Sequence, residues 1–208
     1  MNEAAKTSQS GSRPRSNENA YGTILEVAIA LLAESGPAGM KINEVCLRAS
    51  VRPPAVYYHL KCKDGLVAGA VKAVAESWRG QLGANLPEAG SFEARLRAAV
   101  DGWQAMIESP TRPVRLLLAV QMESADLSDE IRETLDQVHA RACRVVTDGI
   151  AKSFGPLPAL DGIGDTVVGL IYAAAIRFDL DRDSSVLRVR LVEAARLLAI
   201  LVNERTCS

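Results

Sequence analysis

Apolar residues recur at helical spacing along most of the chain. Within residues 21–35, apolar side chains fall at i, i+3, i+4, i+7 and i+8 counted from Ile24, which places them on one face of an α-helix. No segment shows four or more residues of clean strand alternation bounded by hairpin turns. The pattern predicts an all-α fold.

Turn signals divide this pattern into about nine helices. Gly36 and Pro37 end the first, and Pro53-Pro54 open the third, because proline's missing N–H has no partner in the first turn of a helix. The helices are expected at about 21–35, 42–49, 53–60, 63–82, 91–109, 112–124, 128–154, 161–178 and 184–203.

Composition shifts predict two folded domains behind a tail. Residues 1–19 are polar and lack apolar periodicity, so a disordered tail is expected there. The run GANLPEAG at 83–90 has the composition of a linker. The predicted domains are therefore residues 20–82 and 83–208.

Charge and cysteine content narrow the class of protein. The 208 residues are 48% apolar, which allows a substantial core, and the net charge of −1 excludes a wholly basic nucleic-acid coat. Residues 1–66 carry eight basic and six acidic residues, so a local basic face remains open. Four scattered cysteines are not a disulfide framework, and no stretch reaches the roughly 18 apolar residues of a membrane span. A cytoplasmic protein without membrane contact is expected.

Residues 42–60 have the spacing of a helix-turn-helix. Two short helices are joined by a three- to four-residue turn, with small Ala49 at their approach and Val51 and Val56 placed to face the core. The outward face of the second helix would then carry cationic, phenolic and imidazole donors, which suit phosphate oxygens and base edges of DNA. These outward residues are Arg52, Ala55, Tyr58 and His59, with Tyr57 at the flank and Lys61 and Lys63 following.

Residues 21–70 resemble the N-terminal domain of the TetR (tetracycline-repressor) family. The resemblance lies in Ile24-Leu25-x-x-Ala28, in Val45-x-x-x-Ala49-x-Val51 and in Val56-Tyr57-Tyr58-His59-Leu60-Lys61-x-Lys63-Asp64. It implies a helix-turn-helix DNA-binding domain followed by a helical effector-binding and dimerisation domain. It also implies a homodimer on double-stranded palindromic operator DNA, joined through the helices at about 161–178 and 184–203.

The same resemblance implies which residues contact DNA. Tyr57, His59 and Lys63 would mainly contact phosphates, and Pro54 and Ala55 would make apolar contacts, as with thymine methyl groups. Including the residues proposed from their chemistry alone, the predicted set is Lys41, Arg52, Pro53, Pro54, Ala55, Tyr57, Tyr58, His59, Lys61 and Lys63.

Three positions depart from the family pattern. Lys41 stands where threonine usually caps the second helix, and a lysine cannot cap an N-terminus but can hold a phosphate. Ser50 replaces the turn glycine, where a positive φ is less comfortable. Arg52 replaces the usual serine cap of the third helix. These changes bear on base preference rather than on DNA binding itself.

The second domain is expected to hold a pocket for a small-molecule effector, mostly apolar because its helix faces carry little charge. His139 and Cys143 share one helical face, but two side chains do not make a metal site, so neither a metal nor a cofactor is expected. The candidate pocket residues are Trp103, Met106, Met122, His139, Cys143, Tyr172 and Phe178.

Together these features predict a repressor that an effector releases from its operator. An enzyme is not expected, because two histidines leave little for a catalytic triad and no phosphate-binding glycine loop is present. Two alternatives stay open. The helix-turn-helix could serve only dimerisation or protein contact, and Cys62, between Lys61 and Lys63, could be a redox switch.

Overall fold

The computed structural model describes residues 17–85, 91–154 and 162–206. Within these residues the chain forms nine α-helices and one 3-10 helix without any β-strand, which confirms the all-α prediction. No helix in this described part is long and apolar enough to cross a bilayer. The helices are α1 (Asn17–Gly39), α2 (Ile42–Ala49), α3 (Pro53–Leu60), α4 (Lys63–Asn85), α5 (Phe92–Glu108), α6 (Pro113–Met122), η1 (Ser124–Asp126), α7 (Asp129–Phe154), α8 (Ile163–Asp181) and α9 (Ser184–Thr206).

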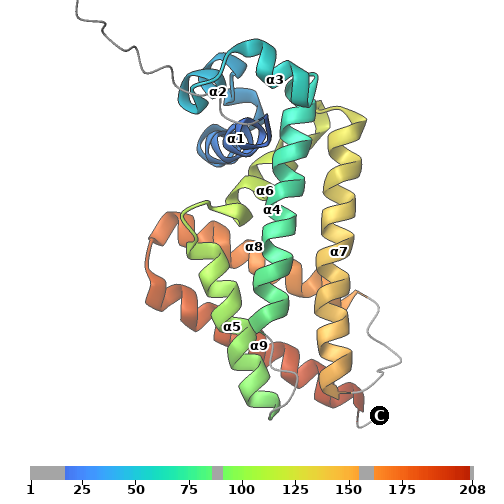
Figure 1. The fold of residues 1–208 in the computed structure, drawn as a ribbon. Coiled ribbons are helices and arrows are strands. Elements are labelled where there is room, and N and C mark those ends of the chain that lie inside the picture. The colour runs from blue at the N-terminus through green and yellow to red at the C-terminus, as the bar shows by residue number, and fades with distance from the viewer. Residues whose placement is uncertain (1–16, 86–90, 155–161, 207–208) are drawn as a thin grey trace, which may run out of the picture.

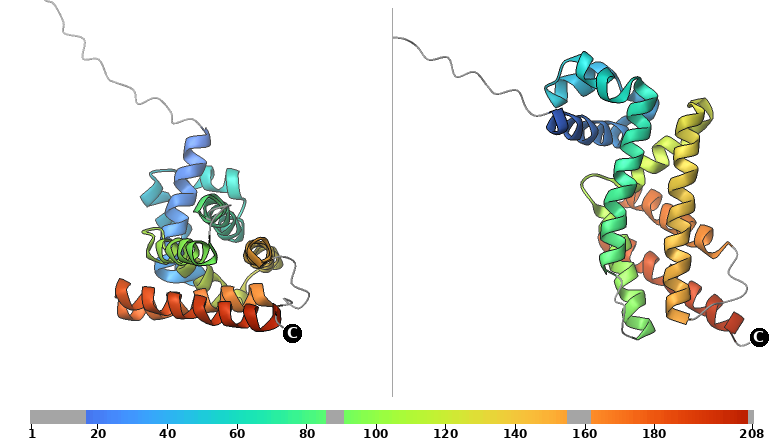
Figure 2. Two further views of the ribbon diagram at one scale, coloured as in Figure 1. Left: turned by 90° about the horizontal axis from the view of Figure 1, so that it is seen from below. Right: turned by 45° about the vertical axis from the view of Figure 1, so that its right-hand side comes forward.

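The short helices α2 and α3 lie at one end of an elongated molecule, with α1 beside them (Figure 1). Helix α4 runs from this end along the length of the molecule, next to α7. Helices α8 and α9 pack on each other at the other end, where α5 joins them (Figure 2). Helix α6 lies between these regions and contacts both α1 and α8.

The predicted helix boundaries are correct for α2 and α3, too short for α1, α4 and α9, slightly too long for α5, α6 and α7, and shifted toward the N-terminus for α8. Helix α1 begins at Asn17, so the predicted tail 1–19 is wrong for its last three residues, and residues 1–16 lie outside the described part. Helix α4 continues to Asn85, into the predicted linker 83–90, of which 86–90 also lie outside. Glycine and asparagine are poor helix formers, but extending an existing helix costs far less than starting one.

Helix α1 is kinked at Gly36. This residue has φ 68° and ψ 178°, a backbone region that is essentially restricted to glycine. The predicted end of the helix is therefore a break in helical geometry, after which helical hydrogen bonding resumes up to Gly39. At the kink the Ala38 N–H donates to the Glu123 Oε2 at 2.7 Å. The kink thus lets α1 meet the residue that follows α6.

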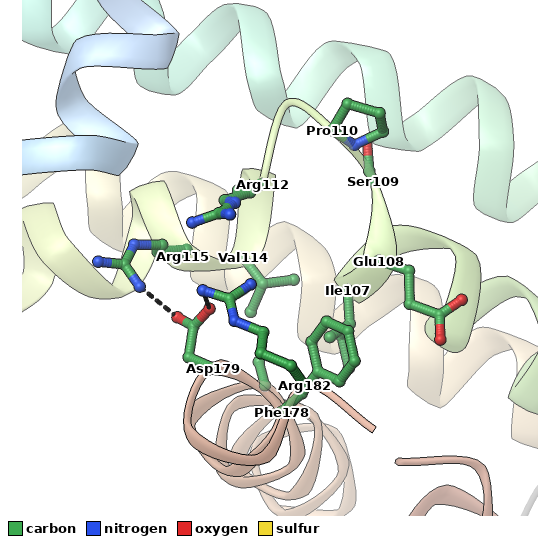
Figure 3. A pocket seen from close by; sticks show the side chains of 11 residues that line it. Ile107, Glu108, Ser109, Pro110, Arg112, Val114, Arg115, Phe178, Asp179 and Arg182 are labelled. Atoms are coloured by element: carbon green, nitrogen blue, oxygen red, sulfur yellow. Dashed lines mark hydrogen bonds and ion pairs between the residues drawn. The ribbon is translucent and has the colours of Figure 1, made fainter. Parts of the chain in front are cut away.

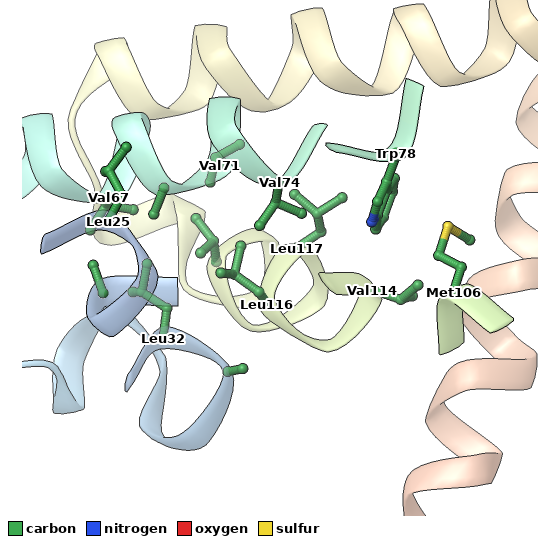
Figure 4. Close-up of a cluster of buried hydrophobic side chains, with 14 of the residues drawn as sticks. Leu25, Leu32, Val67, Val71, Val74, Trp78, Met106, Val114, Leu116 and Leu117 are labelled. Atoms are coloured by element: carbon green, nitrogen blue, oxygen red, sulfur yellow. The ribbon is translucent and has the colours of Figure 1, made fainter. Parts of the chain in front are cut away.

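A single apolar core joins the two ends of the molecule. Side chains of α1, α4 and α6 interleave in it (Figure 4). Trp78 of α4 is 9% exposed and lies near Val114 of α6 and Met106 of α5. Its indole N–H has no hydrogen-bond acceptor among the described residues. Because this core runs across the predicted boundary near residue 83, packing as well as chain connectivity links α1 to the C-terminal helices.

Candidate DNA-binding helix and effector-binding region

Helices α2 and α3 form a helix-turn-helix through a left-handed residue. Ser50 has φ 54° and ψ 42°, and the Val51 N–H donates to the Cys46 carbonyl oxygen at 3.0 Å across the turn. Ala49 and Val56 are buried, so they hold the two helices together from inside. A non-glycine residue in this conformation is strained by roughly 1–2 kcal/mol. Ser50 stands where the family pattern has a glycine, and it adopts the positive φ expected at that position.

The outward face of α3 presents the predicted donors to solvent. Tyr57 and Tyr58 are 50% and 74% exposed, while Val56 between the helices is 1% exposed. Neither proline has an N–H to donate, and the Ala55 N–H bonds the Arg52 carbonyl oxygen. The remaining predicted residues of this region are exposed or half-buried: Lys41, Arg52, Pro53, Pro54, Ala55, His59, Lys61 and Lys63.

His59 is positioned by a residue that sequence reasoning missed. The ring of Tyr21, from the first turns of α1, lies 5.5 Å from the His59 ring, and Tyr58 approaches the same imidazole edge-on at 5.1 Å. These aromatic contacts restrict the histidine ring at the surface. Tyr21 stands three residues before Ile24, on the same helical face as the apolar stripe, and this spacing is the signal that could have indicated its contact with α3.

A strained turn fixes the lysines that follow α3. Lys61 has φ 59° and ψ −50°, and the Cys62 N–H donates to the Leu60 carbonyl oxygen at 2.6 Å, which is the geometry of a γ-turn of the rare form. The Cys62 Sγ in turn accepts the Gly65 N–H at 3.4 Å, at the start of α4. Lys61 and Lys63 are therefore held close to the end of α3.

The start of α2 adds backbone donors to this surface. Lys41 precedes the helix with an extended backbone and makes no side-chain cap, so the first N–H groups of α2 keep no intrahelical partner. A helix N-terminus next to an ammonium group suits a phosphate. Arg48, by contrast, bonds Glu44 and Glu34 at 2.7 and 3.0 Å, so its charge is already paired.

A cavity of about 240 Å³ opens between the α5–α6 turn and α8 (Figure 3). Arg115 and Arg182 both approach the Asp179 carboxylate, at 2.8 and 3.0 Å. Arg112 also lines the cavity and has no ion pair among the described residues. These groups make the lining more charged than the mostly apolar pocket expected from sequence. The complete lining is Ile107, Glu108, Ser109, Pro110, Arg112, Val114, Arg115, Ala175, Phe178, Asp179 and Arg182.

The predicted pocket residues do not gather in this cavity. Only Phe178 lines it, whereas Met122 is 84% exposed at the end of α6. Met106 is buried in the core, and Trp103 is half-buried and packs against it. Helical periodicity alone does not reveal which side chains of different helices lie together.

The other three predicted residues lie together between α7 and α8. His139 and Cys143 of α7 face Asp165 in the first turn of α8, a residue that sequence reasoning missed. Burial, with a smaller effect of Cys143, raises the pKa of the nearby Tyr172 to about 12. The Cys143 thiol also has a raised pKa, because of burial and then the Asp165 carboxylate.

Helix α6 connects the cavity to α1 by hydrogen bonds at both of its ends. The Arg115 Nε donates to the Ala33 carbonyl oxygen at 2.6 Å, while another nitrogen of the same guanidinium bonds Asp179 of α8. Past the far end of α6, Glu123 accepts the Ala38 N–H. A displacement of α6 would therefore strain contacts on α1 directly.

Comparison with known proteins places the N-terminal region in a family. Residues 24–70 match the family described as bacterial regulatory proteins, tetR family. Two tetracycline repressors of Escherichia coli, class A from transposon 1721 and class C, are 33% and 32% identical over 116 and 115 residues. These matches cover 50% of this chain and 50% and 48% of the two relatives, so the chain matches about half the length of these curated relatives.

Solved structures extend the similarity of fold over most of the chain. A TetR-family transcriptional regulator from Agrobacterium tumefaciens superposes with a TM-score of 0.76 at 12% identity, over 86% of this chain and 97% of that one. A TetR regulator from Chloroflexus aurantiacus gives 0.71 at 19% identity, over 89% and 97%. Residues 24–70 thus match the tetR family in sequence, and most of the chain shares the helical fold of these solved regulators.

Proposed function

We propose that this chain is a DNA-binding transcriptional repressor that a small-molecule effector releases from a palindromic operator. The observation that carries the proposal is the exposed face of α3. It presents two phenols, an imidazole and flanking cations on a helix-turn-helix, within the segment that matches the family. The matched family is one of bacterial regulatory proteins.

In this proposal α3 enters the major groove and the flanking groups bind the backbone. Tyr57, His59 and Lys63 would contact phosphates, together with Lys41 and the first N–H groups of α2. Pro54 and Ala55, at the start of α3, would face base edges. Arg52, Pro53, Tyr58 and Lys61 complete the proposed contact surface.

A homodimer would bring two copies of α3 to successive major grooves, roughly 34–36 Å apart. Large apolar side chains remain exposed on α8 and α9, at the end of the molecule away from α3, and a second copy would cover them. These exposed residues are Ile176, Leu180, Val189, Leu197 and Ile200.

The cavity beside Arg112 is the proposed effector site, and its charge favours an acidic compound. Arg112, Arg115 and Arg182 outnumber the two acidic residues of the lining. Arg115 belongs to the cavity and also holds the Ala33 carbonyl oxygen of α1. An effector that draws Arg115 toward itself would weaken this bond and alter the position of the DNA-binding end. By linkage, operator DNA should weaken effector binding by the same factor.

Binding to DNA from the flanking intergenic region, and to sequences selected from random DNA, tests the function. We expect palindrome-specific binding with a steep salt dependence. Tyr57→Ala and His59→Ala should each weaken it about tenfold or more, equivalent to roughly 1.4 kcal/mol, while the dimer stays intact. Gln137→Ala, an exposed substitution on α7, is the matched control. An intact dimer with no specific DNA sequence would refute the proposal and favour a module for protein contact.

A further inference from the structure

Three side chains of different chemistry converge between α7 and α8. The His139 Nε2 lies 2.7 Å from the Asp165 Oδ1, and the Cys143 Sγ lies 3.5 Å from the same nitrogen and 3.6 Å from the same oxygen. One ligand atom from each residue thus falls within 4.8 Å of the other two. His139 and Cys143 are one helical turn apart, and Asp165 comes from the neighbouring helix.

These distances fit a tetrahedral metal ion. With bond lengths of about 2.3 Å to sulfur and about 2.0–2.1 Å to nitrogen and oxygen, the edges of the tetrahedron are about 3.6 Å for S···N and S···O and about 3.3 Å for N···O. The two observed sulfur distances already match. Only the His139–Asp165 hydrogen bond has to lengthen, by about 0.6 Å, and the Asp165 side chain is 68% exposed, which leaves room for this small shift.

Gly164 allows α7 and α8 to approach each other closely. A Cβ at this position would lie 2.7–2.9 Å from backbone and side-chain atoms of Cys143, so only glycine allows α8 to pack this closely. Because Asp165 directly follows Gly164, the close contact between the helices places the Asp165 carboxylate beside the Cys143 thiol. The His139 Nδ1 is buried and has no hydrogen-bond partner among the described residues, which leaves Nε2 as the ring nitrogen that faces the cluster.

We propose that His139, Cys143 and Asp165 bind one divalent transition-metal ion of the zinc class. A thiolate, an imidazole and a carboxylate suit zinc or cobalt, whereas magnesium and calcium prefer oxygen ligands alone. Three protein ligands leave the fourth tetrahedral position for water or for an exogenous ligand. His139 and Cys143 are the two ligands visible in the sequence, and the fold supplies the third.

Titration of the reduced full-length protein with Co²⁺ tests the site without DNA, so its outcome is independent of the proposed regulatory function. We expect one equivalent to produce a thiolate-to-cobalt charge-transfer band together with tetrahedral d–d bands, and Zn²⁺ to abolish both. Cys143→Ser should remove the charge-transfer band. His139→Asn and Asp165→Asn should each weaken binding by more than about tenfold.

Two further variants test whether the cobalt signal comes from this cluster. Cys62→Ser removes an exposed cysteine outside the cluster and should leave the spectrum and the affinity unchanged. Gly164→Ala should weaken Co²⁺ binding while circular dichroism still reports a helical fold. Absence of the band in the wild-type protein, or its persistence in Cys143→Ser, would overturn the proposal and leave His139 and Asp165 as a hydrogen-bonded pair alone.

Discussion

Substitution of Gly36 by alanine tests how the kink in α1 joins the two ends of the molecule. At φ 68° and ψ 178°, a residue with a Cβ is strained by about 1–3 kcal/mol. The new Cβ would lie 2.3 Å from the Glu123 Oε1, so this carboxylate has to move away from the Ala38 N–H. Loss of that hydrogen bond adds roughly 0.5–1.5 kcal/mol, and the reduced freedom of the unfolded chain offsets about 0.4–1 kcal/mol.

The expected loss in the free energy of unfolding is therefore about 2 kcal/mol. For a chain of this length that corresponds to a fall in Tm of about 4–8 °C, measured by far-ultraviolet circular dichroism. Gly22→Ala is the matched control, because it lies in the same helix and its Cβ would meet no atom within 4 Å. That control should raise stability by up to about 1 kcal/mol. A Gly36→Ala protein as stable as the wild type would refute the reasoning.

Three further predictions concern other parts of the chain. Ser50→Gly relieves the left-handed serine and should raise the free energy of unfolding by about 0.5–1 kcal/mol in urea denaturation; an unchanged midpoint would contradict this. Tyr21→Ala should weaken DNA binding about fivefold through the loss of roughly 1 kcal/mol of packing on His59, whereas Tyr21→Phe keeps the ring and should bind as the wild type does. The Asp183 carboxylate accepts hydrogen bonds from Ser185 and the Val186 N–H at the start of α9, which lower its pKa. Its stabilisation is thus complete above the ordinary aspartate pKa and is lost as pH falls through the lowered value, so Asp183→Asn should flatten the acid limb of a plot of Tm against pH.

Local rules in the sequence predicted the helix-turn-helix well. Proline at Pro53 and the small and apolar residues Ala49 and Val56 act within a few positions of each other, so their spacing alone indicated the boundaries of α2 and α3. The same spacing predicted that Tyr58 faces outward with Tyr57 at the flank, and both are exposed.

Contacts between distant segments could not be read in this way. Asp165 meets Cys143 because α8 packs on α7, and no periodicity within either helix encodes that crossing. The cavity likewise combines the α5–α6 turn with α8. The size of Phe178 makes it a candidate pocket residue from the sequence, whereas Arg112 and Arg115 are not such candidates, because an arginine in a sequence is more often on a solvated surface.

The buried indole of Trp78 has a practical consequence. The chain has only two tryptophans, so Trp103→Phe would leave Trp78 as its single strong fluorophore. This indole lies against α5 and α6, in apolar surroundings that favour short-wavelength emission. A shift of α6 relative to α4 would change its contact with Val114 and hence its emission wavelength and quenching. The protein therefore carries an intrinsic optical reporter at the joint between its two ends, readable during ligand or DNA titration without an added label.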